Sequence, residues 1–387
     1  MLAGYCVSDD AGLEALHDEW DALAVRCGRP GSSPDLLLAW WRHLRPPGAA
    51  ARVVAVRDGD GALVGVAPLL VADGPMRLPF MRFLGTPSMP QRAGIVARAE
   101  DEGPVAAAVA EALGNSSPRP AAVSLDRIDA DRAWPGILAG AWPGRHGAHI
   151  FREFRVPVPT LSTASGDVER WRATRSSNTR HAATATRRRL AARGAEVRRL
   201  EHPDELGPAL AAFARLQAQR WGPRSQLWLP PSIAMLREAG VAMLGAGRMR
   251  VYAVTDGAEV GAVAILFAAG GEVLAWNGAW DPGWARERPF MAALDRAIED
   301  CFAEGDRRLD FGEGDQPFKL RLADGEDAIS WTTMLARGRG HRRAWAATAR
   351  TRWTLGLRAR ARRLPPPAQQ AIRTVLNRAR TARATPG

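Results

Sequence analysis

One lysine, Lys319, stands among the 53 basic side chains of this 387-residue chain. A lysine ammonium is a compact, strongly hydrated point charge, which a planar guanidinium does not reproduce, so Lys319 is a candidate functional residue. The alternative is that a composition biased toward arginine retained one lysine by chance. Residues 307–311 alternate like a short strand, and the two glycines around Glu313 predict a turn after it. We therefore expect Asp310 and Lys319 to meet at the carboxyl end of a strand, where open α/β sheets hold their sites.

The turn and the residues after it have a defined spacing. Residues 310–314 read D-x-G-x-G, and Phe318-Lys319 follow, behind an expected helix and ahead of an expected last strand. With this pattern, the chain from about Leu13 to Arg337 resembles the CelD/BcsL-like acyltransferases. The resemblance implies two tandem lobes of the GNAT superfamily, similar in layout to Fem-type aminoacyltransferases, with the lysine of the F-K step close to substrate phosphates.

An eight-residue repeat divides the chain in two. Residues 52–59 match residues 250–257 at six of eight positions, and two expected helices precede each copy. With the resemblance, the repeat predicts an α/β protein with two tandem GNAT-like lobes, each a mixed central sheet flanked by helices. The alternative is that the two segments match only because hairpins in an alanine- and valine-rich chain have similar sequences. We expect an N-terminal lobe at 1–157, a linker rich in Pro, Ser and Thr at 158–168, a catalytic C-terminal lobe at 169–337 and a basic helical tail at 338–387.

The composition is that of a soluble globular protein, with 46% hydrophobic and 24% charged residues. Three cysteines without C-x-x-C spacing suggest neither a disulfide framework nor a zinc site, and His146 and His149 have no acidic or cysteine neighbours, so no metal is expected. The first 20 residues are acidic and lack the pattern of a signal peptide, and no apolar run is long enough to span a bilayer. We expect a cytoplasmic protein.

The net charge of +12 resides in the residues from 328 onward, which include 14 arginines and no acid. Two basic helices are expected there, separated by three prolines at 365–367. The mixture of Trp, Leu and Arg in the first suits the anionic surface of the inner membrane; nucleic acid, tRNA included, would attract the same charge, and a packed helix with solvated arginines is the third possibility. A second basic helix, expected over Val168 to Arg193, is either a solvated face or a wall for an anionic substrate, with Arg180 as a candidate substrate-binding residue.

A helix that begins directly after a strand offers free backbone N–H groups and the positive end of its dipole, which suits a pyrophosphate. By the resemblance, acetyl-CoA or another acyl-CoA would bind at the start of the helix expected from Pro289. The segment departs from the family pattern, because it lacks Q/R-x-x-G-x-G/A and has a phenylalanine where relatives often have glycine. The candidate cofactor-binding residues are Arg286, Glu287, Arg288, Pro289 and Phe290.

Acylation of an amine by a thioester needs a base for the ammonium proton and donors for the oxyanion. We assign Asp310 and Glu313 as candidate catalytic acids or bases and Lys319 to a phosphate or the oxyanion. The alternatives are a turn cap, a solvated glutamate and an ion-paired lysine. Trp276 and Asn277, expected at the end of a strand, are candidate substrate-binding residues, although core packing is the commoner use of tryptophan.

The expected function is acyl-CoA-dependent transfer to an amino or hydroxyl group of an amino sugar or another small polar acceptor. The resemblance links such proteins to polysaccharide or envelope formation. Two alternatives stay open: Fem-like transfer of an aminoacyl group from tRNA, and a non-catalytic, membrane-associated partner of a polysaccharide synthase.

Overall fold

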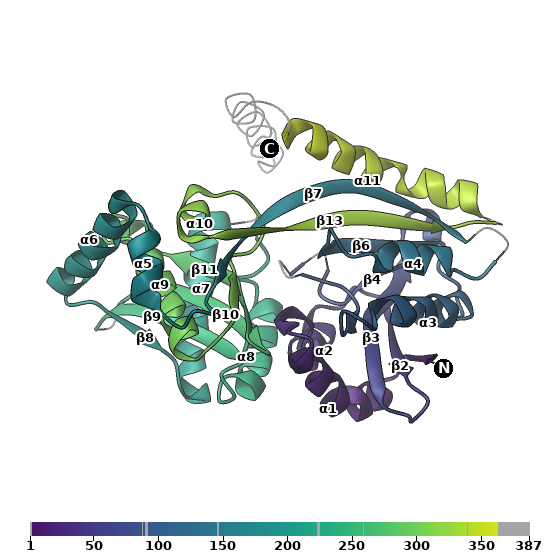
Figure 1. Cartoon of the computed structure of the whole chain (residues 1–387), viewed down its shortest axis with the longest axis horizontal. Coiled ribbons are helices and arrows are strands. Elements are labelled where there is room, and N and C mark those ends of the chain that lie inside the picture. Colours follow the sequence, from purple (N-terminus) through teal and green to yellow (C-terminus); the bar gives the residue numbers. More distant parts are fainter. Residues whose placement is uncertain are drawn as a thin grey trace, which may run out of the picture.

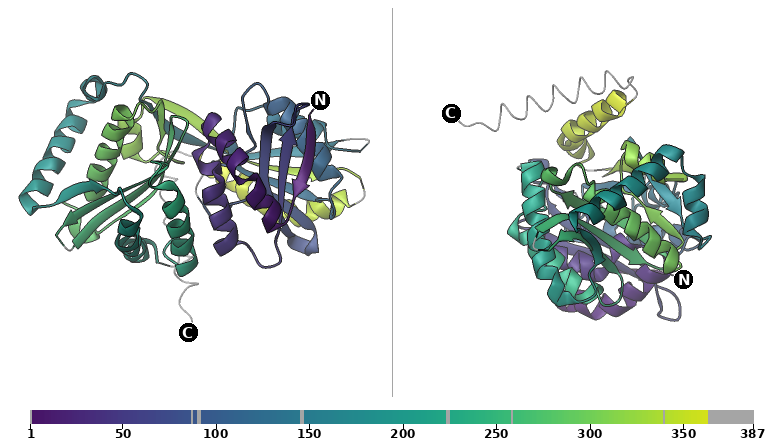
Figure 2. Two further views of the ribbon diagram at one scale, coloured as in Figure 1. Left: turned by 90° about the horizontal axis from the view of Figure 1, so that it is seen from below. Right: turned by 90° about the vertical axis from the view of Figure 1, so that its left-hand side faces the viewer.

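The structure, a computed structural model, describes residues 2–86, 88–89, 92–144, 147–222, 225–257, 259–338 and 340–362. A mixed sheet of 13 strands runs through this part of the chain, with helices packed on it (Figure 1). Two lobes lie side by side along the long axis of the molecule (Figure 2). Figure 1 and the right-hand view of Figure 2 show the carboxyl-terminal helix α11 outside the sheet.

The first lobe begins with a strand and two helices, whose buried side chains recur at helical spacing. A hairpin, a third strand, a helix and a parallel strand follow. The elements are β1 (Ala3–Val7), α1 (Asp10–Arg26), α2 (Pro34–Leu44), β2 (Ala50–Arg57), β3 (Leu63–Asp73), β4 (Pro79–Phe83), β5 (Val96–Ala97), α3 (Glu102–Gly114), β6 (Ala122–Asp129), α4 (Trp134–Gly140) and β7 (Ala148–Ser162).

The second lobe repeats this order after two extra helices. Its elements are α5 (Val168–Thr174), α6 (Ser177–Arg193), β8 (Glu196–Arg199), α7 (Leu206–Trp221), α8 (Pro230–Met243), β9 (Met249–Asp256), β10 (Glu259–Ala269), β11 (Glu272–Trp280), α9 (Pro289–Ala303), β12 (Arg308–Asp310), α10 (Pro317–Leu322), β13 (Gly325–Ala336) and α11 (His341–Arg362). The two matching eight-residue segments begin the equivalent hairpins β2–β3 and β9–β10. The predicted repeat is confirmed.

The two lobes exchange their last strands. The order across the sheet is β1-β2-β3-β4-β6-β13-β7-β12-β11-β10-β9-β8, so β13 of the second lobe pairs with β6 and β7 of the first lobe pairs with β12. Strands β7 and β13 also pair with each other, antiparallel, from Gly325↔Thr160 to Ala336↔Ala148. Each lobe is therefore completed by a strand of the other, and α11 lies across this central pair (Figure 1).

Two sequence expectations about local structure are wrong. Residues 158–162 continue strand β7, although they were expected to open the linker at 158–168; the connection begins only after Ser162. The basic helix expected over Val168 to Arg193 is two helices, α5 and α6, because Ser176 leaves the helical conformation and its hydroxyl caps α6 by accepting from the N–H of Thr179. The second tail helix falls outside the described residues.

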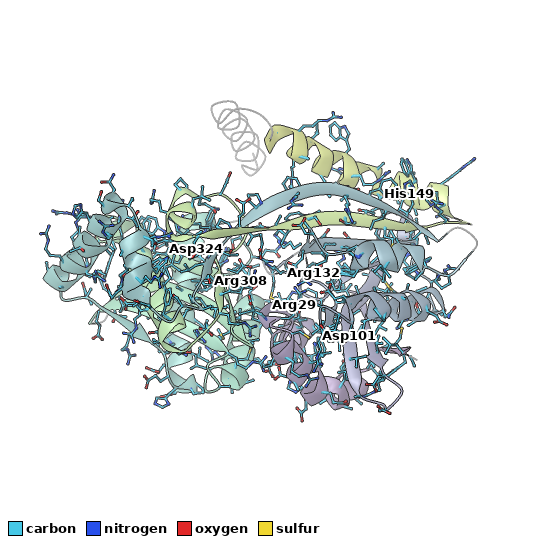
Figure 3. All side chains as sticks on the ribbon, viewed as in Figure 1. Arg29, Asp101, Arg132, His149, Arg308 and Asp324 are labelled. Atoms are coloured by element: carbon cyan, nitrogen blue, oxygen red, sulfur yellow. The ribbon has the colours of Figure 1, made fainter. Side chains whose placement is uncertain are left out.

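One of the buried core clusters and a network of ion pairs span both lobes. A single apolar cluster includes Trp40 of α2 and Phe213 of α7. At the boundary, Arg92 donates to Asp310 (2.6 Å), Asp129 (2.7 Å) and Asp327 (2.8 Å). Asp129 also accepts from Arg29 at 2.6 Å, and together the two guanidinium groups lower its pKa despite its burial. Figure 3 places Arg29 and Arg308 in this central region.

Replacing Arg92 should destabilise the whole molecule. Arg92→Ala leaves the Asp129, Asp310 and Asp327 carboxylates without their common partner, so we expect a loss of about 3–5 kcal/mol in the free energy of unfolding, measured by urea denaturation. Arg155→Ala is the control, because the Arg155–Asp131 pair is exposed and should contribute less than about 1 kcal/mol. A loss for Arg92→Ala no greater than for this control would contradict the role of the network.

Candidate active site

The site forms where β11 and β12 separate. The two strands run parallel and pair only from Glu272↔Arg308 to Leu274↔Asp310. Beyond this point β11 stays with β10, with a bulge at Trp276, whereas the chain after Asp310 turns away. A cavity of about 770 Å³ opens between them.

The cavity brings together seven of the eleven candidate residues from the sequence, and four lie elsewhere. Arg286 and Glu287 precede the helix without lining the cavity; Asp310 lies beside it in the Arg92 network; Arg180 is exposed and donates to the backbone carbonyls of Ala173 and Arg175. The residues that line the cavity are Trp276, Asn277, Arg288, Pro289, Phe290, Glu313 and Lys319.

Lys319 holds the backbone of the turn. Its ammonium donates to the carbonyl oxygens of Gly312 (3.1 Å) and Glu313 (2.8 Å), and not to the Asp310 carboxylate that the sequence suggested as its partner. Burial lowers the pKa of Lys319, and the nearby acids, Asp310 first, oppose that shift. Asp310 itself accepts from the N–H of Gly312 at 2.6 Å and caps the turn.

The last strand of the first lobe also holds this turn. The carbonyl of Pro159 accepts from the N–H of Phe311 (3.1 Å), and that of Pro157 accepts from the N–H of Gly314 (3.0 Å). Although proline has no N–H to donate, it keeps a carbonyl that can accept. The turn is therefore built by residues of both lobes.

Glu313 is the one carboxylate among the described residues that line the cavity. Arg127 of β6 donates to it through Nε at 3.1 Å. Arg127 has a positive φ of 59° where β6 bulges against β13, and bulges of this kind re-aim side chains. The ion pair with Arg127 holds the Glu313 side chain in one position beside the cavity.

The first turn of α9 forms another wall. Arg288 has a left-handed backbone (φ 54°), its carbonyl accepts from Met291 and Ala292, and Pro289 takes the first helical position. Phe290 does not close the cavity, because residue 278 opposite it is glycine: a Cβ there would lie 2.1 Å from the ring. Pro289 has no N–H, and those of Met291 and Ala292 donate to the Arg288 carbonyl, so the positive end of the helix dipole, rather than a set of free N–H groups, is what this wall offers to a phosphate.

Sequence reasoning missed the two arginines that hold the acids. Arg92 and Arg127 lie 218 and 186 residues before their partners, in the other lobe, and no local pattern marks them. Gln217 of α7 was also missed; its amide donates to Asn277 Oδ1 at 2.7 Å and fixes that side chain. A helical pattern places Gln217 among buried apolar residues, and such a buried amide is the one signal that could have singled it out.

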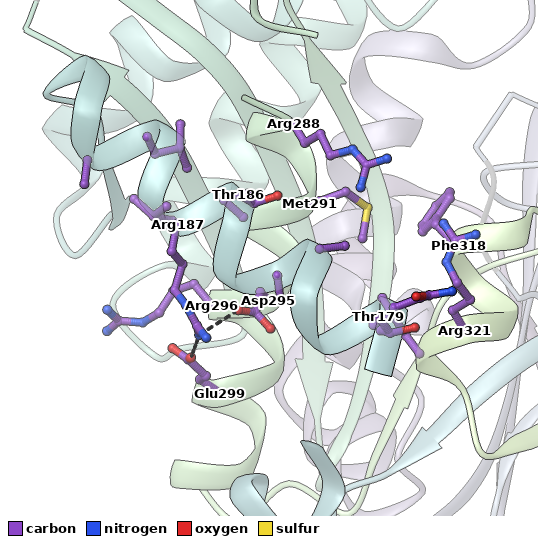
Figure 4. A pocket seen from close by; sticks show the side chains of 18 of the residues that line it. Thr179, Thr186, Arg187, Arg288, Met291, Asp295, Arg296, Glu299, Phe318 and Arg321 are labelled. Carbon is purple, nitrogen blue, oxygen red and sulfur yellow. Dashed lines mark hydrogen bonds and ion pairs between the residues drawn. The ribbon is translucent and has the colours of Figure 1, made fainter. Parts of the chain in front are cut away.

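A second cavity of about 800 Å³ lies between α6 and α9 (Figure 4). It shares Arg288, Met291 and Phe318 with the first cavity. At its other end Arg187 lies 3.4 Å from Asp295 and 3.8 Å from Glu299. The small side chains of Ala182, Ala183 and Ala191 on α6 leave part of this space unfilled.

Two further searches cover the described residues alone. No group of three or more His, Cys, Asp or Glu side chains in them is placed to hold a metal ion, and His146 lies outside them. None of the helices that the structure describes is long and apolar enough to cross a membrane.

Comparisons with known proteins agree with this geometry. Residues 177–320 match the family described as the acetyltransferase (GNAT) domain. The structure is similar to FemX (12% identity, TM-score 0.59, covering 85% of this chain and 97% of that one) and to the C-terminal domain of a protein named as a lysylphosphatidylglycerol synthetase, from Agrobacterium fabrum (10%, 0.56, 89% and 96%). No curated protein sequence matches the chain.

The predicted fold class and the predicted acyltransferase activity are confirmed at the level of the superfamily. The matched segment runs from α6 to α10 and contains the cavity. The first lobe repeats the strand order of the second, and the two similar structures cover both lobes. The chain therefore contains a segment that matches an acetyltransferase (GNAT) domain, within a fold of two similar lobes, and a GNAT domain implies an acyl-CoA co-substrate.

Substituting Gly278 should close the cavity. In Gly278→Ala the new methyl group would displace the Phe290 ring, so we expect affinity for acetyl-CoA, measured by calorimetric titration, to fall at least tenfold. The double variant Gly278→Ala/Phe290→Ala should recover most of it. Gly245→Ala is the control, because a Cβ there meets nothing within 4 Å. Unchanged affinity in Gly278→Ala would show that the ligand does not bind beside this strand.

Proposed function

We propose that this protein transfers an acyl group from acyl-CoA to an amino or hydroxyl group of an amino sugar or another small polar acceptor, in the formation of polysaccharide or envelope material. The observation that carries the proposal is the cavity at the β11–β12 separation. It joins the start of α9 to the turn held by Lys319, within the segment that matches the acetyltransferase domain. The link to polysaccharide follows from the CelD/BcsL-like sequence pattern.

Residues on two sides of the cavity have separate tasks in this proposal. The first turn of α9 and the Arg288 guanidinium bind the phosphates of the acyl-CoA, which supplies an activated acyl carbon and a thiolate leaving group. Glu313 takes the proton of the attacking amine or hydroxyl group, because it is the carboxylate at the cavity wall. Lys319 positions Glu313 by holding its backbone carbonyl.

Acetyl-CoA should bind to the purified protein, and Lys319→Ala and Pro289→Gly should weaken it. Lys319→Ala releases the turn and removes a positive charge, and Pro289→Gly loosens the helix start, so we expect a loss of roughly tenfold in each, by calorimetric titration. Leu320→Ala is the matched control, since Leu320 is next to Lys319 and 51% exposed. Absence of heat with the wild-type protein, and of competition by coenzyme A, would rule out a thioester donor.

A second candidate is transfer of an aminoacyl group from tRNA. The similarity to FemX supports it at the level of the fold, and the basic tail suits nucleic acid. This candidate requires binding of aminoacyl-tRNA that coenzyme A does not displace. A gel-shift titration with charged tRNA, with and without coenzyme A, separates it from the first.

We also propose that α11 holds the protein against an anionic membrane surface. On this helix Trp353 is 68% exposed and Leu357 is 42% exposed, one turn apart. Arginines but no acids accompany them, and the exposed ones are Arg342, Arg343, Arg350, Arg358 and Arg360. Exposed aromatic and basic side chains on one helix suit the interface of a bilayer that contains anionic lipid.

The full chain should sediment with vesicles that contain phosphatidylglycerol, and not with vesicles of phosphatidylcholine alone. Arg358→Ala/Arg360→Ala should weaken the association roughly tenfold or more, since each arginine near such a surface contributes about 1 kcal/mol. Arg237→Ala, an exposed arginine on α8, should change it little. Equal binding to both kinds of vesicle would contradict an electrostatic association.

A further inference from the structure

The last turn of α7 adds a guanidinium to the cavity. Arg220 and Trp221 line it together with Trp280 from the end of β11. The guanidinium carbon of Arg220 lies 5.1 Å from the ring centroid of Trp221 and 5.0 Å from that of Trp280. Two indole rings thus hold one planar cation at the cavity rim, and contacts of this kind favour arginine over lysine.

Arg220 has no anionic partner within the described part of the chain. Arg215, on the same helix, lies 3.4 Å from Asp281 and donates to the carbonyl of Val260, whereas no hydrogen bond or ion pair joins the Arg220 side chain to any described residue. The Arg220 side chain is exposed at the cavity rim, and the partial loss of its hydration lowers its pKa, because no carboxylate offsets it. A guanidinium held in one place without a counter-charge is a ready partner for an oxyanion.

The amide of Asn277 is a further donor in the same cavity. Asn277 Oδ1 accepts from Gln217 (2.7 Å) and from the N–H of Gly278 (2.8 Å), which leaves its amide N–H groups for a ligand. A ligand oxygen at this wall would satisfy the Asn277 amide.

We propose that the acceptor substrate carries an oxyanion, a carboxylate or a phosphate, and that Arg220 binds it while Trp221 and Trp280 hold the guanidinium in place. This inference rests on the proposed function, since it assigns the acceptor of that same cavity. The donor phosphates have their own cradle at the start of α9, and Arg220 comes from a different element. An acceptor with an oxyanion would gain two parallel charge-assisted hydrogen bonds from the planar fork of Arg220.

The test uses inorganic phosphate and succinate as probes, each titrated by calorimetry into the full chain. We expect one or both to bind the wild-type protein, and Arg220→Ala to lose at least tenfold in affinity for the probe that binds. The preferred probe shows whether the oxyanion is a phosphate or a carboxylate. Arg215→Ala is the matched control on the same helix and should stay within twofold of the wild type.

Parallel titrations with acetyl-CoA separate this inference from the proposed function. Weakened probe binding with unchanged acetyl-CoA binding in Arg220→Ala supports it. If Arg220→Ala weakens acetyl-CoA binding as strongly as probe binding, Arg220 belongs to the donor site and the inference is overturned while the acyltransferase stands. If neither probe binds the wild-type protein, or if Arg220→Ala binds them as well as the wild type does, the inference is also overturned. Failure of acetyl-CoA to bind the wild-type protein would instead contradict the proposed function.

Discussion

The exchange of last strands between the two lobes is the constraint on which the rest of the structure depends. Strand β7 supplies the carbonyls of Pro157 and Pro159 to the turn at residues 311–314, so the site of the second lobe is completed by the first. In return, β13 fills the place beside β6. Neither lobe has a complete sheet alone, which explains why the buried core and the ion pairs continue across the boundary.

The same exchange of strands determines where the two carboxylates of the site lie. Asp310 lies against Arg92 and caps the turn, whereas Glu313 lies against Arg127 and lines the cavity. Both arginines belong to the first lobe. The lobe without the matched acetyltransferase segment therefore sets the positions of the carboxylates in the lobe that has it, which gives the duplication a structural role at the site.

Local features of the site could be predicted from the sequence, and its long-range features could not. The turn at 310–314, the helix from Pro289 and the repeated hairpin follow from residue types that act on their immediate neighbours. The hydrogen-bond partners of Lys319 could not be predicted. Its ammonium donates to the backbone carbonyls of Gly312 and Glu313, and which carbonyls face it depends on the path of the folded backbone. The continuation of β7 through two prolines was missed for a similar reason, since only their carbonyls are needed there.

The paired strands β7 and β13 have a consequence for how substrates enter. They cross the boundary between the lobes as a long antiparallel ladder, from Gly325↔Thr160 to Ala336↔Ala148, with one register shift between Trp331 and Thr332. Hinged closure of one lobe over the other would break the backbone hydrogen bonds of this ladder, so a hinge motion between the lobes would cost a large free energy. Substrates must therefore reach the cavity without a change in the angle between the lobes, which move as one body.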